Sequence, residues 1–515
     1  MASTIQNALK KSRQIYFLIE CDFGGLIKRY STKDIGLGDY HFAGKVLSMS
    51  DVGTTFNLRT FSYTRSSVGV TIINDDRLQD EEAHRVLDGG KCTIRIWCEG
   101  LTWANIEDDG IVFTGTFRKD AHDKATYSFS IEDASHDMAM VPGVYITDDT
   151  FPSHRKTDGG GSVSGKPLPL IFGDFPGGIP LLCVDTSNYY YAISLGIIKT
   201  TDQDITDGDE TIYEKDGSDA GAANCEIKSG ITEGQPYTYM DSTPDEVDAE
   251  PLSMSVRGIK DGSGDITGTA DALIEHPADI VHYLILNYGI GFDPHIESLG
   301  TVKATLPGLK FASYINSAAA TADVCQRILN QCQGSTIMRK GEIGAVVFDP
   351  GAATRAMLSK QYHNLASGIK ITKTTWDNIC NRLTVNYRLN MASGQYEGQI
   401  TRDKDNSDRC NDSYYQYGEQ PEVVLELPDV QNEADAVYVA NRYLTVHSHR
   451  HDIVELSMAY GDGFDLLECD CAAWTIAEGA STDGDGYDED KFVLLDRKLT
   501  RHGIKQRWWR VKHDY

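Results

Sequence analysis

The feature that most limits how this chain can fold is the succession of short apolar runs near its start. Between residues 15 and 140, runs of β-branched and aromatic residues alternate with Gly, Asp and Asn, which favour turns. This pattern is typical of strands, and the spacing of the runs predicts a closed or nearly closed antiparallel barrel. The runs are IYFLIECDF, KRYST, HFAGKVLSM, GVTIIN, KCTIRIWC, GIVFTGTFR and TYSFSIED.

A change of composition follows this β segment. The stretch DDTFPSHRKTDGGGSVSGKP gathers Pro, Gly and Ser without apolar periodicity, which predicts a linker. The next run, PLPLIFGDF, cannot form a central strand because proline offers no N–H to a ladder. From 181 to 275 the chain is again strand-like but rich in turn residues, so we expect a β-rich inserted domain.

Helical periodicity first appears at residue 277. Pro277 opens a stretch with one apolar stripe that Gly289 ends, and Thr321 is the expected N-cap of a second helix that stops at Gly334. A hairpin with its turn near Gly341 follows. We therefore expect a compact unit of helices on a hairpin, whose core has no room for a ligand.

The remainder of the chain returns to a β pattern. A polar loop, TRDKDNSDRCNDS, interrupts it, and a third amphipathic helix is expected from Asn432 to about His447. The fold class expected for the whole chain is mainly β with a small α+β insert. The expected divisions are a first β-barrel domain at 1–145, a linker at 146–164, a β-rich inserted domain at 165–275, a small α+β insert at 276–365 and a second β-barrel domain at 366–515.

Size and charge limit the classes of function. A chain of 515 residues exceeds the size at which one core stops growing, so three or four domains are expected. Its 48 basic and 76 acidic residues give a net charge of −28. Such a surface repels duplex DNA and anionic membranes. The charge is equally consistent with a role in solubility alone.

Membrane insertion and a disulfide framework are not predicted. No stretch approaches the roughly 20 apolar residues that cross a bilayer, and the start lacks the apolar run of a signal peptide, so we expect synthesis in a cytoplasm. Eleven cysteines are scattered without CxxC pairs. Cys92 with Cys98, and Cys325 with Cys332, each share one face of an expected element and are read as buried small hydrophobic residues rather than as a disulfide or a metal cluster.

The search for chemistry predicts no catalytic, cofactor-binding or metal site. Motifs of serine hydrolases, nucleotide-binding loops and zinc proteases are absent from the sequence. Acid pairs such as Asp108 with Asp109 and Asp148 with Asp149 are interpreted as loop charge. The run HSHRH at 447–451 suits either a metal or, as we favour, a solvated helix end. The acidic loop 481–490 resembles a calcium loop through Asp483 and Asp485 but departs from it at Tyr487 and Asp488, and is interpreted as a hairpin tip.

Two adjacent tryptophans mark the final strand. Neighbouring residues of a strand point to opposite faces, so at most one of Trp508 and Trp509 enters the barrel to which the strand belongs. The other is either an anchor at an interface with another chain or packed on a neighbouring domain of the same chain.

Several junctions resemble those of one family. The runs GKPLPLIFGDF at 165–175, ADIVHYLILNYGIG at 278–291 and WDNICNRLTVNYRLN at 376–390 stand where domains meet in the tail hub and tail-tip proteins of tailed phages, which are related in fold to the baseplate hub of contractile tails. A fourth run, DGFDLLECDCAAWTI at 462–476, resembles a strand pair of that family. It departs from the family's Pro-Gly-Asp turn, because Glu468, Cys469 and Asp470 stand there.

The resemblance implies a structural virion protein at the tip of a phage tail, made in the host cytoplasm. It implies a homotrimer in which two barrels per subunit give six around a ring, so that a three-fold hub closes a six-fold tail tube. Implied partners are tail-tube or distal tail proteins, the C-terminus of the tape-measure protein and central tip or fibre proteins, with genome DNA passing unbound through the lumen. The rival hypotheses are a cell-wall or polysaccharide hydrolase and a receptor-binding tip.

Overall fold

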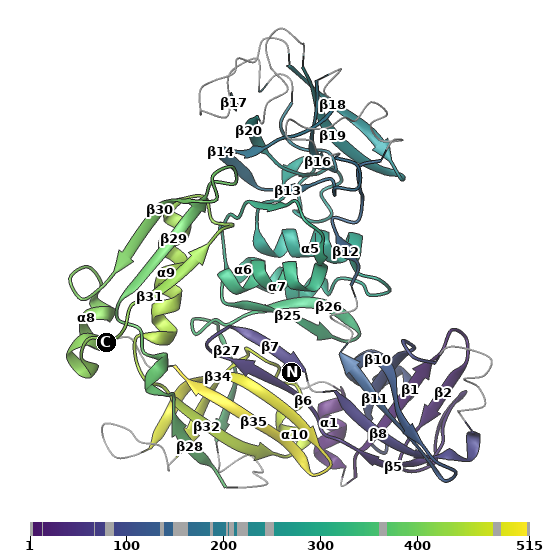
Figure 1. Ribbon diagram of the computed structural model, residues 1–515. Coiled ribbons are helices and arrows are strands. Elements are labelled where there is room, and N and C mark those ends of the chain that lie inside the picture. Colours follow the sequence, from purple (N-terminus) through teal and green to yellow (C-terminus); the bar gives the residue numbers. More distant parts are fainter. Residues whose placement is uncertain are drawn as a thin grey trace.

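The chain is mainly β, with several separate sheets and a few short helices. In Figure 1 the two largest sheets lie side by side at one end, and the β-rich insert stands at the opposite end. The computed structural model describes residues 4–12, 14–65, 67–77, 87–133, 138–147, 163–185, 189–201, 204, 211–213, 225–242, 252–359, 368–476 and 486–511.

The first large sheet contains seven antiparallel strands. Their order is β2 (Ile27–Tyr30), β1 (Tyr16–Asp22), β9 (Lys91–Trp97), β10 (Ile111–His122), β11 (Thr126–Asp133), β8 (Val68–Ile73) and β5 (Val46–Met49). Ser31, directly after β2, donates its N–H to Ala43 O (2.8 Å) and accepts from the N–H of Val46 on β5 (2.9 Å), so hydrogen bonds connect the two ends of the sheet. The mainly β class is confirmed, and closure of this sheet into a barrel stays a prediction. The helices α1 (Thr4–Lys11) and α3 (Trp103–Ile106) and the pair β3 (Ile35–Leu37) and β4 (Tyr40–Phe42) accompany it.

The second large sheet is built from both ends of the chain. Its main path is β27 (Thr354–Ser359), β33 (Cys471–Ile476), β34 (Tyr487–Thr500), β35 (Gly503–Arg510), β32 (Asp452–Met458) and β28 (Lys370–Lys373), and β6 (Val52–Asn57) with β7 (Ser62–Arg65) joins it through β34. The pair β27–β33 is parallel, and β27 comes from outside the range expected for the second barrel, 366–515. The short helix α10 (Tyr460–Gly463) follows β32.

The second large sheet thus contains strands from outside the range 366–515 that was expected to form it. The hairpin β6–β7 lies within 1–145 but belongs to the second sheet, and so does β27 from 276–365. Part of 366–515 forms a separate sheet in the order β30 (Tyr396–Arg402), β29 (Leu383–Leu389) and β31 (Val423–Leu427), with α8 (Asp408–Tyr417) and α9 (Glu433–His447) beside it. The five divisions stay a prediction as domain limits.

The central unit places three helices on a hairpin. The helices are α5 (Pro277–Tyr288), α6 (Ile296–Thr305) and α7 (Thr321–Gln331), and the hairpin is β25 (Gly334–Arg339) with β26 (Glu342–Val347). The expected stripes are buried, since Ile280, Leu284 and Ile328 are each 0% exposed. Their core continues into β29 and α9, so this unit shares one core with the three-stranded sheet instead of enclosing its own.

The starts of three helices can be compared with the prediction: those of α7 and α8 differ from it, and that of α9 agrees. Ala320 is the N-cap of α7, and the hydroxyl of Thr321 instead donates to Ala139 O (2.6 Å). The polar loop TRDKDNSDRCNDS contains the start of α8, whose N-cap Ser407 accepts a hydrogen bond from the N–H of Cys410. The helix from Asn432 is confirmed, because Asn432 is the N-cap of α9.

The β-rich insert forms two small sheets around a separate core. One has the order β14 (Asp174–Pro180), β20 (Ser253–Arg257) and β17 (Ile212–Tyr213). The other has the order β15 (Leu182–Asp185), β16 (Tyr190–Leu195), β19 (Gln235–Ser242) and β18 (Cys225–Thr232). One strand pair, β13 (Leu170–Phe172) with β23 (Ser313–Ile315), connects the insert with the central unit. The pair β12 (Met140–Val141) with β24 (Ala319–Ala320) connects the segment before the insert with that unit, and β21 (Lys260–Asp261) with β22 (Ala272–Leu273) lies within the insert.

Candidate functional site: the junction of the two large sheets

The hairpin β6–β7 fastens the N-terminal part of the chain to the second sheet. β6 pairs with the end of β34, with Thr54 opposite Arg497. The carboxylate of Asp496 accepts the N–H of Phe56 (2.6 Å) and pairs with Nε of Arg507 (2.6 Å), while Nη2 of Arg507 donates to Phe56 O (2.9 Å). The backbone N–H and C=O of Phe56 are therefore both hydrogen-bonded by side chains of β34 and β35. Burial raises the pKa of Asp496, against the attraction of Arg507.

An aromatic cluster covers one side of this junction. Phe56 of β6 stacks on Phe348 (5.6 Å between ring centroids), and Phe348 meets the ring of Trp509 edge to face (5.2 Å). Trp508, on the opposite face of β35, meets Trp474 in a different core. Both tryptophans are 0% exposed. Of the two predicted roles for the second tryptophan, packing on another part of the same chain is therefore confirmed.

A crevice of about 400 Å³ lies beside the junction. Its walls come from β6, β10, the hairpin β25–β26 and β34. Lys340 pairs with Asp109 (2.6 Å), and the hydroxyl of Thr54 donates to a carboxylate oxygen of Glu468 (2.6 Å). Asp109, predicted to be loop charge, is thus engaged in a contact between the first sheet and the central hairpin.

Arginines extend this network along the crevice. Arg339 donates from Nη2 to Glu468 O (3.3 Å), and Arg497 donates from Nη2 to Phe464 O (2.8 Å). Arg355 pairs with Asp470 (2.8 Å). Glu468 and Asp470, which stand at the departure from the family's turn, therefore serve to hold the segments around the junction together. These ion pairs connect different segments of the chain, so the charged side chains along the crevice bind one another and have a structural role.

The histidines of HSHRH do not form a solvated helix end. His447 and His451 are each 3% exposed. The ring of His447 lies 4.3 Å from that of Tyr443, and the ring of His451 lies 4.0 Å from that of Trp509, between centroids. Their Nδ1 atoms contact Asn378 O and Arg510 O, both at 3.1 Å. Burial lowers the pKa of His447 to about 4, so this ring is neutral at neutral pH.

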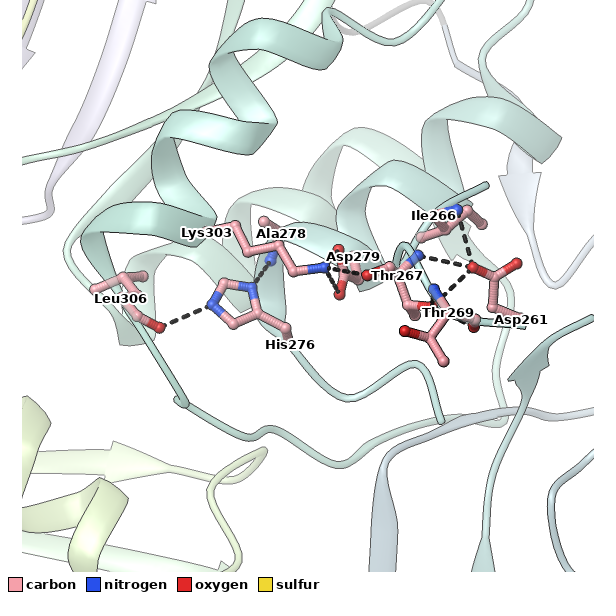
Figure 2. A network of polar contacts seen from close by, with 9 residues as sticks. All are labelled: Asp261, Ile266, Thr267, Thr269, His276, Ala278, Asp279, Lys303 and Leu306. Carbon is pink, nitrogen blue, oxygen red and sulfur yellow. Dashed lines mark hydrogen bonds and ion pairs between the residues drawn. The ribbon is translucent and has the colours of Figure 1, made fainter. Parts of the chain in front are cut away.

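A polar network fixes the helices of the central unit above the junction (Figure 2). His276, the N-cap of α5, accepts from Ala278 N at Nδ1 (3.1 Å) and faces Leu306 O with Nε2 (2.9 Å). Because a carbonyl only accepts, Nε2 carries the proton and the ring is neutral. Burial lowers the pKa of His276. The side chain thus connects the start of α5 with the end of α6.

The same network orders the loop before α5. Asp261 accepts N–H groups of Gly264 (3.0 Å), Ile266 (2.9 Å) and Thr267 (2.7 Å). Burial alone would raise the pKa of Asp261, but the hydrogen bonds from Thr267 and Ile266 outweigh it and lower the pKa. Lys303 of α6 joins the loop to α5, because its Nζ reaches Thr267 O (2.9 Å) and the carboxylate of Asp279 (2.8 Å).

Metal-binding side chains do not converge within the described ranges. No group of three His, Cys, Asp or Glu side chains there is close enough to hold an ion. Residues 481–485 of the acidic loop 481–490, and the pair Asp148 and Asp149, lie outside the described residues. Cys325 and Cys332 are buried as predicted. Cys92 and Cys98 are buried as predicted as well, and Sγ of Cys92 lies 2.9 Å from that of Cys21 on β1, a neighbour that spacing did not indicate.

Nothing among the described helices is long and apolar enough to cross a bilayer. No family model matches the sequence, and no curated protein matches it either.

Solved structures do match the fold. A chain of the virion of a native gene transfer agent particle is 12% identical, with a TM-score of 0.43, over 68% of this chain and 85% of that one. The tail protein from Neisseria meningitidis MC58 is 10% identical, with a TM-score of 0.37, over 97% of both chains. A prophage tail protein from Listeria monocytogenes EGD-e is 8% identical, with a TM-score of 0.38, over 96% of this chain and 94% of that one. Because these TM-scores lie below 0.5, function has to be argued from the geometry of the chain itself. The chain is similar to tail proteins of phages and prophages, the group that its sequence resembles.

Proposed function

We propose that this chain is a structural virion protein, the hub subunit that closes the distal end of a phage tail tube. The observation that carries the proposal is the junction between the two large sheets. Backbone pairing of β6 with β34, the clamp of Asp496 and Arg507 on Phe56 and the aromatic cluster together hold the sheets as one body. A rigid pair of sheets is the unit that a ring-shaped adaptor requires.

In this proposal three copies form the hub. Two large sheets per copy give six around the ring, which lets a three-fold hub meet a six-fold tube. Tail-tube or distal tail proteins would bind one face, and the tape-measure C-terminus and a central tip or fibre protein would bind from the axis.

The charge of the chain supports a passage for DNA. A net charge of −28 places carboxylates over the surface, and a lumen lined by them repels phosphate. Genome DNA would then pass through the lumen without binding. The carboxylates that line it also repel one another, but salt screens this repulsion beyond about 8–10 Å.

The proposal makes the protein structural and not a hydrolase. Its support is that Asp109, Asp470 and Asp496, at or near the junction, each pair with a lysine or arginine of another segment. Hydrolysis of a glycosidic bond instead needs a proton donor and a second carboxylate that face the substrate. The purified chain should accordingly leave peptidoglycan and capsular polysaccharide intact, and release of sugar fragments would contradict this part of the proposal.

The decisive experiment is the symmetry of the particle. We expect the mass of the purified protein to correspond to three chains, and images of the tail tip to show six similar sheets around one axis, with Asp and Glu facing the channel. A single copy in the particle would refute the trimer. A channel lined with Lys and Arg would refute the role assigned to the charge.

A further inference from the structure

A second groove lies where three segments remote in sequence meet. These are the turn between β6 and β7, the end of α7 and the strand β31, and the groove has a volume of about 540 Å³. Its walls include Phe61 from the turn, Arg327 and Gln333 from α7 and its end, and Leu425 and Glu426 from β31. Figure 1 shows β31 on the side of its sheet that faces α7. The groove therefore runs along a strand.

β31 is an edge strand. It pairs in parallel with β29, and no strand in the described ranges pairs with its other side. The N–H of Val423 bonds to Arg382 O (2.9 Å), and because alternate residues of a parallel strand face the same partner, the backbone groups of Val424 and Glu426 face away from β29. The side chain of Val424 is 52% exposed. Such an edge is a template on which another strand can pair.

Gln333 provides an independent indication of a ligand. Its side chain is 2% exposed, and neither Nε2 nor Oε1 has a hydrogen-bond partner. The neighbouring Gln331 differs, because its Nε2 donates to Asp429 (2.5 Å) and its Oε1 accepts from Asp429 N (3.1 Å). A buried amide without hydrogen-bond partners destabilises the folded chain, because the amide has lost its hydrogen bonds to water and gained none in return. Its presence in the wall of the groove points to a polar group that another molecule supplies.

We propose that this groove holds an extended peptide segment of a neighbouring tail protein, added as a strand to β31. A side chain of that segment with an amide or hydroxyl group would bond to Gln333. Arg59 and Arg327 are balanced in the walls by Asp323 and Glu426, which favours a segment without net charge. A sugar would also satisfy the amide of Gln333, but it would leave the backbone groups of β31 unpaired. The inference rests on the proposed function, since the assembled tail supplies the neighbour.

Hydrogen–deuterium exchange tests the strand addition without knowledge of the partner. Exchange is measured for peptides that cover 423–427 in the isolated chain and in the purified tail. Pairing of the outward N–H groups should slow the exchange of this strand at least tenfold in the tail. Equal exchange in a tail that contains the chain would overturn the groove and leave the hub function standing, whereas absence of the chain from the tail would refute the hub function itself.

Two variants and a cross-link separate the remaining outcomes. Gln333→Leu removes the unpaired amide, so the isolated chain should melt at the same or a higher temperature while the slow exchange in the tail is lost. Val424→Pro removes an outward N–H and should likewise abolish the slow exchange of 423–427 in the tail. Gln399→Leu, on the exposed face of the far strand β30, should change neither this exchange nor the melting temperature. A photo-cross-linker at position 424 should capture a polypeptide segment in the purified tail. Retained slow exchange in both the Gln333 and the Val424 variant, or capture of a glycan, would overturn the proposal.

Discussion

Removal of the carboxylate of Asp496 tests the junction most directly. Asp496→Ala leaves the N–H of Phe56 without an acceptor and Arg507 without its anion. A hydrogen bond to a charged group contributes about 1.5–3 kcal/mol. Because the side chains of Asp496 and Arg507 are 19% and 33% exposed, the lost ion pair itself adds only about 1 kcal/mol. The expected cost is therefore about 3 kcal/mol, which corresponds to roughly 100-fold in an opening equilibrium.

A conservative variant distinguishes the hydrogen bond from the charge. Burial raises the pKa of Asp496, so its charged form is already costly in the folded chain. Asp496→Asn keeps an oxygen that accepts from Phe56 and should cost only about 1 kcal/mol.

Hydrogen–deuterium exchange of β6 measures both effects, since opening of the junction exposes the amides of Val52–Asn57. Asp488→Ala is the matched control, because Asp488 is an exposed residue of the same strand. The reasoning is refuted if Asp496→Ala leaves the exchange of β6 unchanged, or if Asp496→Asn accelerates it as much as alanine does.

Three further changes probe other parts of the fold. His447 takes up a proton near pH 6.5 when unfolded but only near pH 4 when folded, so the unfolded state binds more protons between these values and stability falls by about 3 kcal/mol as the pH drops from 6.5 to 4. Melting curves of wild type and His447→Gln over this range should differ in slope, and parallel curves would contradict the assignment. Leu284→Ala, at a 0% exposed position of α5, should cost about 2–5 kcal/mol, and an unchanged melting temperature would show that the site is loosely packed. Trp509→Ala should cost about 3–5 kcal/mol and open the hairpin β6–β7, which faster trypsin cleavage after Arg59 would reveal; unchanged cleavage would contradict the role of the aromatic cluster.

Local signals in the sequence were sufficient for the elements with strong periodicity. The alternation in TYSFSIED predicts β11, where Tyr127, Phe129 and Ile131 are each 0% exposed. Pro277 and Gly289 likewise delimit α5. The helix α8 was missed because DRCNDSYYQY carries no apolar stripe, and only its N-cap Ser407 signals a start.

Long-range pairing could not be predicted in the same way. Nothing in VGTTFN distinguishes a strand of the first sheet from one that pairs with β34, because both are half-buried alternating runs. The burial of His447 depends in part on Phe61, whose ring reaches it from the turn between β6 and β7. The unpaired amide of Gln333 has no sequence signature at all.

The pairing of Thr54 with Arg497 also governs when the chain can fold. These residues are 443 positions apart, so β6 has only its hairpin partner β7 until nearly the whole chain has left the ribosome, and its other edge stays unpaired. At about 5–20 residues per second, β6 then waits roughly 20–90 s for β34. During this interval the unpaired edge of β6 and the ring of Phe56 are open to aggregation. Prematurely terminated chains lack β34 and cannot complete the junction.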